Sequence, residues 1–129
     1  MDNYIKEGSF STPSVNLNAT SGLLKLLGRS IPENPVKHYQ PIEGWFKNFI
    51  QTSPSKITLQ IHLDYLNTHS TECVLILMKI LESYYKSSNA DVKIIWNFDE
   101  DDDDIEDLGD DLSTLLDIPF ETIEVLEKD

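Results

Sequence analysis

The chain has 129 residues, an apolar content of 40% and a formal net charge of −13 at pH 7. Its 10 Lys and Arg residues are scattered, which argues against nucleic-acid binding because phosphate contacts need clustered basic side chains. No run long enough to cross a bilayer and no secretory signal is visible, and the single Cys73 cannot form an internal disulfide, so we expect a cytoplasmic protein.

In chain order, the sequence predicts a weakly ordered arm over residues 1–13 and then a single domain over residues 14–129. A β-hairpin is expected at 14–28, where apolar residues alternate with polar ones on both sides of a turn-forming segment. Pro41 fits the first turn of a helix that runs to Gln51, because a missing N–H costs nothing there. The remaining predicted elements are a strand, a helix, a strand, a helix and a strand, at residues 57–66, 71–85, 92–98, 105–116 and 120–125.

The clearest pattern is the change of period between residues 57 and 85. From Ile57 to Tyr65 every second residue is apolar or aromatic, which predicts a strand with one buried face. From Val74 to Tyr85 the apolar residues recur every three or four positions, which predicts a largely buried helix. The element order therefore indicates an α/β fold, with a mixed sheet of about five strands flanked by about three helices.

An unbroken acidic run, Asp99 to Asp104, raises the question of a metal site. Its alternating aspartates are typical of an EF-hand loop, but Asp104 stands where that loop needs glycine and Asp110 where it needs a bidentate glutamate. A solvated acidic loop leading into a helix is therefore the preferred interpretation, because carboxylates suit a helix N-terminus. Weak binding of a divalent ion stays open.

Other chemistry finds little support in the residue pattern. His38, His62 and His69 fall on three different predicted elements without ligand spacing, so neither a zinc site nor any other cofactor site is predicted. No phosphate-binding loop, nucleophile elbow or dinucleotide fingerprint is present, and an enzyme is disfavoured.

The segment between the predicted central strand and its helix is rich in hydroxyl groups: Asn67, Thr68, His69, Ser70 and Thr71. One interpretation is that Ser70 or Thr68 caps the helix, a contribution of about 1 kcal/mol. The alternative is a phosphoacceptor, because orphan N–H groups and the helix dipole favour a phosphate at a helix start. The residue types alone leave both possibilities open.

A family resemblance distinguishes between them. The segment LDYLNTHSTECVLILMKILE, residues 63–82, resembles the signature of the SiaC family of bacterial regulatory phosphoproteins, roughly L-x-Y-F-N-T-S-S-x-K followed by a long apolar helix. The similarity extends through residues 28–34, 39–41, Trp45 and 96–101, and covers about residues 12–126. It implies a fold similar to STAS domains, the anti-sigma-factor antagonists.

The resemblance also implies a function. In that family a threonine of the N-T-S-S turn is phosphorylated by a Ser/Thr kinase related to anti-sigma-factor kinases, and a PP2C-like phosphatase removes the phosphate. The unphosphorylated protein binds and activates a diguanylate cyclase, which links the switch to cyclic-di-GMP signalling and biofilm formation. The matching threonine is Thr68, and Asn67, His69, Ser70 and Thr71 are then expected to bind partners around it.

The sequence departs from the family pattern beside that threonine. His69 and the pair Thr71-Glu72 stand where serine and often lysine are usual, which leaves the acceptor intact and affects the choice of partner. Two alternatives remain: a STAS-like interaction domain that is never phosphorylated, and a small domain that binds divalent metal or has an enzymatic activity.

Overall fold

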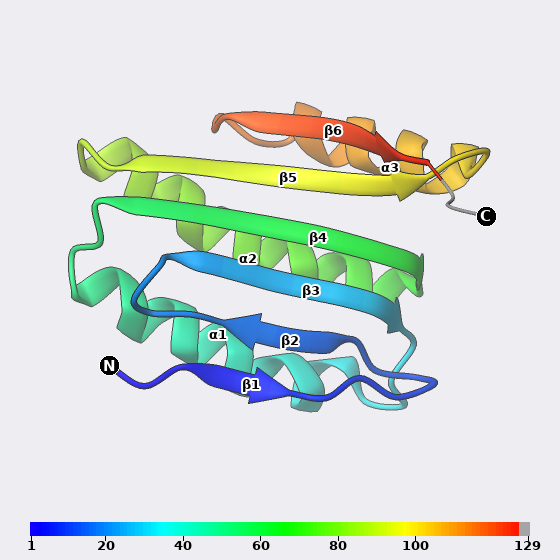
Figure 1. The fold of residues 1–129 in the computed structure, drawn as a ribbon, viewed down its shortest axis with the longest axis horizontal. Coiled ribbons are helices and arrows are strands. Elements are labelled where there is room, and N and C mark those ends of the chain that lie inside the picture. The colour runs from blue at the N-terminus through cyan, green and yellow to red at the C-terminus, as the bar shows by residue number, and fades with distance from the viewer. Residues whose placement is uncertain (127–129) are drawn as a thin grey trace.

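The computed structural model describes residues 1–126, so the last three residues of the predicted domain, 127–129, lie outside the described part. One sheet and one layer of helices account for the regular structure (Figure 1). The elements are β1 (Tyr4–Lys6), β2 (Ser14–Leu17), β3 (Leu23–Ser30), α1 (Pro35–Gln51), β4 (Lys56–Leu66), α2 (Thr68–Ser87), β5 (Asp91–Asp99), α3 (Asp103–Thr114) and β6 (Phe120–Val125). The predicted α/β class, mixed sheet and three helices are thereby confirmed, with six strands instead of about five.

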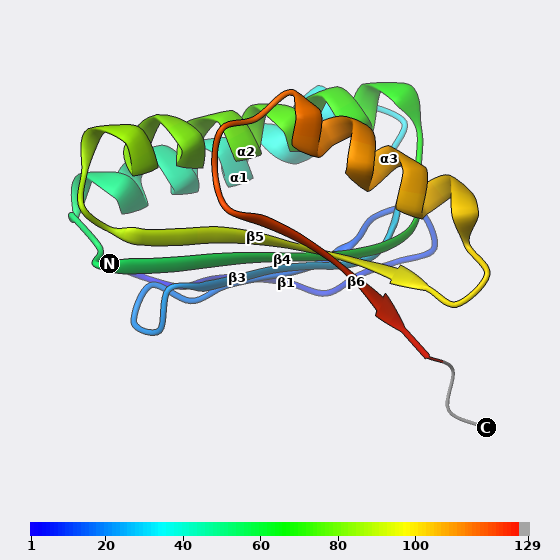
Figure 2. The same cartoon turned by 90° about the horizontal axis from the view of Figure 1, so that it is seen from above.

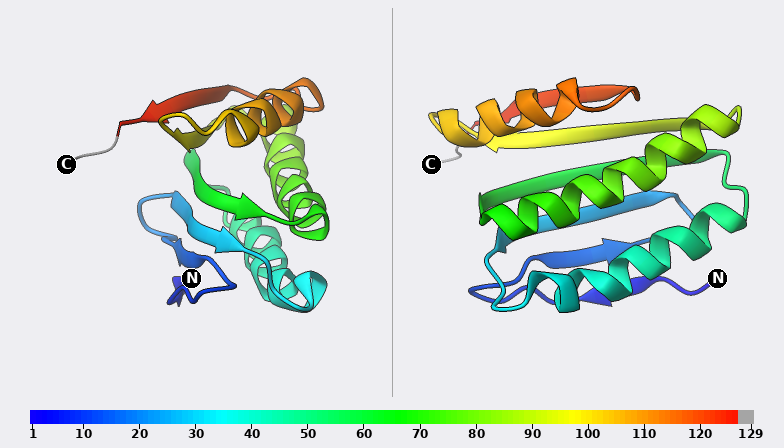
Figure 3. Two further views of the ribbon diagram at one scale, coloured as in Figure 1. Left: turned by 90° about the vertical axis from the view of Figure 1, so that its right-hand side faces the viewer. Right: turned by 180° about the vertical axis from the view of Figure 1, so that it is seen from behind.

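The strands lie in the sheet in the same order as in the chain, β1-β2-β3-β4-β5-β6. The first two pairings are antiparallel and the three from β3 to β6 are parallel. Because crossovers between parallel strands are right-handed and the strand order never reverses, α1, α2 and α3 all pack on the same face. Figures 2 and 3 show this single helical layer and the opposite face of the sheet, which no described helix covers.

The core lies between the sheet and the helices. The buried side of β4 consists of the alternating residues predicted from the sequence, which are Ile57, Leu59, Ile61 and Leu63. Aromatic side chains of α1 pack against the sheet, and Trp45 stacks on Phe49 with ring centroids 4.8 Å apart. None of the helices in residues 1–126 combines the length and the apolar character needed to cross a membrane.

Two predicted boundaries are wrong. The arm predicted over residues 1–13 contains β1, which forms the sheet edge beside β2 and is held by long-range contacts, such as Trp45 Nε1 donating to the Asp2 carbonyl at 2.9 Å. The helix predicted from Pro41 begins at Pro35, behind an Asn34 cap that accepts from the Lys37 N–H at 3.1 Å. Pro41 therefore lies inside α1, because packing of the flanking turns outweighs the one backbone bond that it lacks.

One hydrogen bond connects α2 with the segment that follows α3. Glu82 on α2 accepts a hydrogen bond from the backbone N–H of Asp117, in the segment between α3 and β6. Its side chain is 12% exposed and also lies 3.6 Å from the Lys79 ammonium. The hydrogen bond from the Asp117 N–H lowers the pKa of Glu82 below its ordinary value of 4.5. Desolvation acts in the opposite direction, and the charge of Lys79 adds to the lowering.

We expect Glu82→Gln to reduce the free energy of unfolding by about 1–2 kcal/mol near neutral pH, since a bond to a charged acceptor is replaced by a neutral one. A carboxyl group with a lowered folded-state pKa stabilises the protein above pH 4.5, and this contribution disappears as the pH falls through the folded-state pKa. Urea unfolding of both proteins at about pH 7 and about pH 3 tests this. An equal difference at both pH values would contradict the role of the carboxylate charge.

Candidate functional site

The hydroxyl-rich segment after β4 is the first turn of α2. Asn67 is the N-cap, and its side-chain oxygen accepts from the Ser70 N–H at 2.8 Å. The Asn67 carbonyl accepts from both the N–H and the hydroxyl of Thr71, at 3.0 and 3.1 Å. The interpretation that Ser70 or Thr68 is the cap is therefore wrong, because Asn67, the residue before Thr68, takes that role.

A buried hydroxyl network supports the turn from beneath. The Ser30 hydroxyl, at the end of β3, lies 2.6 Å from the Tyr39 hydroxyl of α1 and donates to the Ser70 hydroxyl of α2 at 3.0 Å. The Asn67 N–H donates to the Ser30 carbonyl at 3.2 Å, so the turn is also joined to the sheet. Burial raises the pKa of Tyr39 to about 12, against a lowering effect of its bond with Ser30, so the phenol stays a neutral partner.

The network divides the predicted site residues into two groups. Thr68 and His69 are exposed, and Asn67 and Thr71 are half-buried. Ser70, which was also expected to bind partners, is fully buried, and its hydroxyl faces Ser30 in the interior. Within residues 1–126 the Thr68 hydroxyl makes no hydrogen bond to protein, and the residue is exposed at the surface.

Sequence reasoning missed Ser30 and Tyr39 as parts of this site. Both lie in the segments 28–34 and 39–41 that carry the family resemblance, which was the available signal. The hydrogen bond between Ser30 and Ser70 joins residues 40 positions apart, and residue spacing does not reveal such a contact.

The acidic run has the role preferred from the sequence. Asp99 ends β5, Asp102 caps α3 by accepting from the Ile105 N–H at 3.2 Å, and Asp103 and Asp104 lie in the first turn of α3. Beyond Asp99, which belongs to β5, the run thus forms a short loop and the start of α3, with carboxylates at the positive end of the helix dipole.

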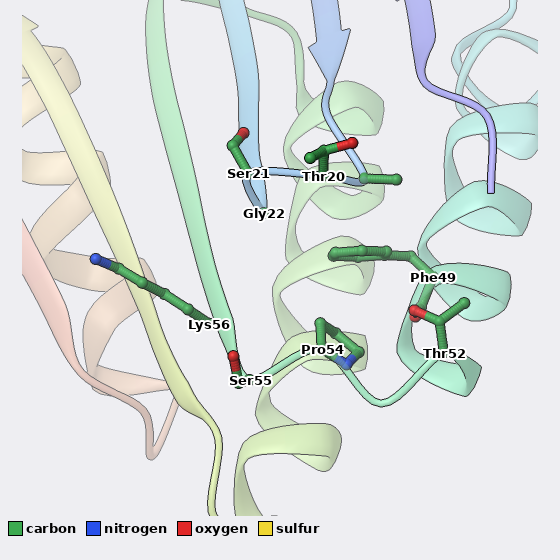
Figure 4. Close-up of a pocket in the computed structure, with 9 residues that line it drawn as sticks. Thr20, Ser21, Gly22, Phe49, Thr52, Pro54, Ser55 and Lys56 are labelled. Atoms are coloured by element: carbon green, nitrogen blue, oxygen red, sulfur yellow. The ribbon is translucent and has the colours of Figure 1, made fainter.

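A cavity of about 310 Å³ lies at the other end of the molecule (Figure 4). It is enclosed by the β2–β3 turn, the C-terminal end of α1 and the linker to β4, with Ser21, Phe49, Thr52 and Lys56 among its lining residues. Lys56 begins β4, whereas Asn67 follows the end of β4, so the strand separates the cavity from the α2 turn. The Lys56 ammonium points away from Phe49 and Thr52.

Comparison with known families assigns the chain. The family model described as "SiaC family regulatory phosphoprotein" matches residues 5–125, nearly the whole sequence. The chain belongs to the SiaC family. It is thus a member of a family of regulatory phosphoproteins and not of a family of enzymes.

Individual relatives agree with this assignment. The chain is 25% identical over 113 residues to an uncharacterized protein of Pseudomonas aeruginosa strain UCBPP-PA14, covering 88% of this chain and 89% of the relative. The fold matches SiaC of Pseudomonas aeruginosa with a TM-score of 0.89 at 23% identity, covering 97% of this chain and all of that one. It also matches a chain in the crystal structure of the diguanylate cyclase SiaD in complex with its activator SiaC from the same organism, with a TM-score of 0.89, 23% identity and coverage of 95% and 99%.

Proposed function

We propose that this protein is a phosphorylation-controlled activator of a diguanylate cyclase, with Thr68 as the phosphoacceptor. The observation that carries the proposal is the division of the α2 turn into an exposed, unbonded Thr68 hydroxyl and a buried Ser70 that holds the turn in place. A kinase can reach Thr68 without unfolding the helix, because neither the cap nor the buried network uses this hydroxyl.

The partners follow from the family and from the position of the turn. The family is one of regulatory phosphoproteins, and the Pseudomonas aeruginosa SiaC, which has the same fold, is an activator in complex with the cyclase SiaD. We infer a cyclase partner for this chain, a Ser/Thr kinase related to anti-sigma-factor kinases that adds the phosphate, and a PP2C-like phosphatase that removes it. We also infer a cytoplasmic location, because the proposed kinase and cyclase would use ATP and GTP.

The fold can accept the phosphate where Thr68 stands. Thr68 is the first residue of α2, where backbone N–H groups without helical partners and the helix dipole favour a negative group. A phosphoryl group there brings about −1.5 to −2 charge to the surface. Phosphorylation therefore changes what the turn can bind and leaves the helix intact.

We expect incubation with the cognate kinase and ATP to add one phosphate to the wild-type chain and none to Thr68→Ala. Intact-mass spectrometry followed by phosphopeptide mapping measures both. Thr68→Ser is the matched control, because it keeps a hydroxyl at the same place and is expected to be phosphorylated. Thr71→Ala is the second control, because it removes a neighbouring hydroxyl that is bonded to the Asn67 carbonyl.

A phosphate that remains on Thr68→Ala would show that the acceptor lies elsewhere. Absence of phosphate from the wild-type chain, both with the kinase and after purification from its own host, would favour an interaction domain that is never phosphorylated.

A further inference from the structure

On the uncovered face of the sheet, side chains of types that commonly bind metals cluster near the C-terminal ends of β4 and β5. His62 and Asp64 of β4 and Asp99 of β5 each place one ligand atom within 4.8 Å of those of the other two. This cluster, which we call the His-Asp-Asp triad, lies across the sheet from the helical layer seen in Figure 2.

Strand register holds the three residues together. His62 pairs with Asn97 in the parallel β4–β5 ladder, and Asp64 and Asp99 each follow two positions later on their own strand. Because side chains alternate between the two faces of a sheet, all three fall on the face opposite the buried Ile61 and Leu63. The triad therefore rests on two neighbouring strands of the central sheet and not on a loop.

Hydrogen bonds already orient part of the triad. His62 Nε2 lies 2.7 Å from Asp99 Oδ1, which aims the imidazole across to the neighbouring strand. Beside it, the Gln60 amide donates to the Asn97 side-chain oxygen at 2.9 Å, which continues the polar row along the same two strands. His62 and Asp99 are half-buried, with side-chain exposures of 28% and 38%.

Positive charge is scarce around the two carboxylates. Within residues 1–126, no Lys or Arg forms an ion pair with Asp64 or Asp99, and His62 is the single basic partner in contact. A divalent cation would supply the charge that these groups lack.

We propose that His62, Asp64 and Asp99 bind a divalent transition-metal ion, with one imidazole nitrogen and two carboxylate oxygens as its protein ligands. The imidazole favours Zn²⁺ over Ca²⁺ and Mg²⁺, which prefer all-oxygen sites. Ligand distances of about 2.0–2.2 Å need the donors closer together than 4.8 Å, so binding requires the exposed Asp64 side chain to turn toward the other two ligands. Three protein ligands leave a coordination position open to water or to a partner's ligand atom.

Titration of the full-length, untagged protein with Zn²⁺ against a fluorescent zinc indicator tests the site, and Co²⁺ absorption reports its ligands. We expect one ion per chain and a Co²⁺ spectrum typical of mixed nitrogen and oxygen ligation. His62→Gln, Asp64→Asn and Asp99→Asn should each weaken Zn²⁺ binding by at least about tenfold. Circular dichroism of each variant establishes that it is folded.

The matched controls lie outside the triad. His69→Gln removes an exposed histidine, and Asp103→Asn removes an exposed carboxylate of the acidic run, so both should bind Zn²⁺ as the wild type does. Absence of Zn²⁺ binding by the folded wild-type chain would overturn the proposal, as would binding that the three triad variants leave unchanged. Ca²⁺ or Mg²⁺ binding that depends on Asp103 and not on His62 would also overturn it, by placing the ion in the acidic loop.

Discussion

Stoichiometric phosphorylation of Thr68 is expected to weaken binding to the partner cyclase by at least about thirtyfold, or about 2 kcal/mol. The unmodified Thr68 hydroxyl is small, neutral and exposed at the start of α2. A phosphate there adds about −1.5 to −2 charge, which must be desolvated or repelled when a partner surface closes over the turn. The chain already carries a net charge of −13, so a partner adapted to its unmodified surface meets still more negative charge.

The experiment compares phosphorylated and unmodified protein on immobilised cyclase by biolayer interferometry, with cyclase activity as a second measurement. Thr68→Ala, treated with the kinase in the same way, is the control and should bind as the unmodified wild type does. Equal affinity of the phosphorylated and unmodified wild type would refute the switch and leave the identity of the acceptor to phosphopeptide mapping. A rise in affinity on phosphorylation would show that the phosphate promotes cyclase binding, which is the opposite of the proposed effect.

The second large effect is expected at Gly109, in the interior of α3. A Cβ atom there would lie 2.3 Å from Trp96 Cδ1 and 2.5 Å from Trp96 Nε1, far inside van der Waals contact. The Trp96 ring is fully buried, and its Nε1 donates to the Ile105 carbonyl at 2.8 Å, so the ring cannot yield without loss of packing and of this bond. Overpacking of this kind costs about 1–3 kcal/mol and the hydrogen bond about 1 kcal/mol.

We therefore expect Gly109→Ala to reduce the free energy of unfolding by about 2 kcal/mol, after allowance for the gain of about 1 kcal/mol from alanine's higher helix propensity. Gly44→Ala is the matched control, because Gly44 also lies inside a helix, α1, and an added Cβ meets nothing within 4 Å. That variant should be more stable than the wild type by up to about 1 kcal/mol. Urea unfolding monitored by tryptophan fluorescence measures both, and a stabilised Gly109→Ala would refute the packing argument.

Local periodicity was sufficient for most of the fold. Two sequence patterns identify the apolar faces of β4 and α2: the alternation from Ile57 to Tyr65 and the helical spacing from Val74 to Tyr85. Burial of these faces in the core stabilises both elements. The boundaries were less predictable where a residue's effect depends on its context. Pro41 has the same local preference at a helix start and inside a helix, and only the packing of α1 decides between them.

The candidate phosphorylation site was predictable because its residues are contiguous. Residues 67–71 follow one another in the chain, and the family resemblance identifies Thr68 among them. What the sequence could not provide was exposure, because Ser70 and Thr68 are both hydroxyl residues of one turn. The Ser70 hydroxyl is buried against Ser30, which in turn bonds Tyr39, whereas the Thr68 hydroxyl lies outside this network.

The residue pattern was thus enough to predict the α/β class, the central strand and helix, the family and the threonine that the switch is proposed to use. These properties depend on residues close together in the chain, where period and spacing are visible. The tertiary structure decided which hydroxyls are buried, why α3 needs glycine at Gly109, and that His62, Asp64 and Asp99 lie together. Each of these depends on strand register or on helix packing, which join residues far apart in the chain and leave no local signal.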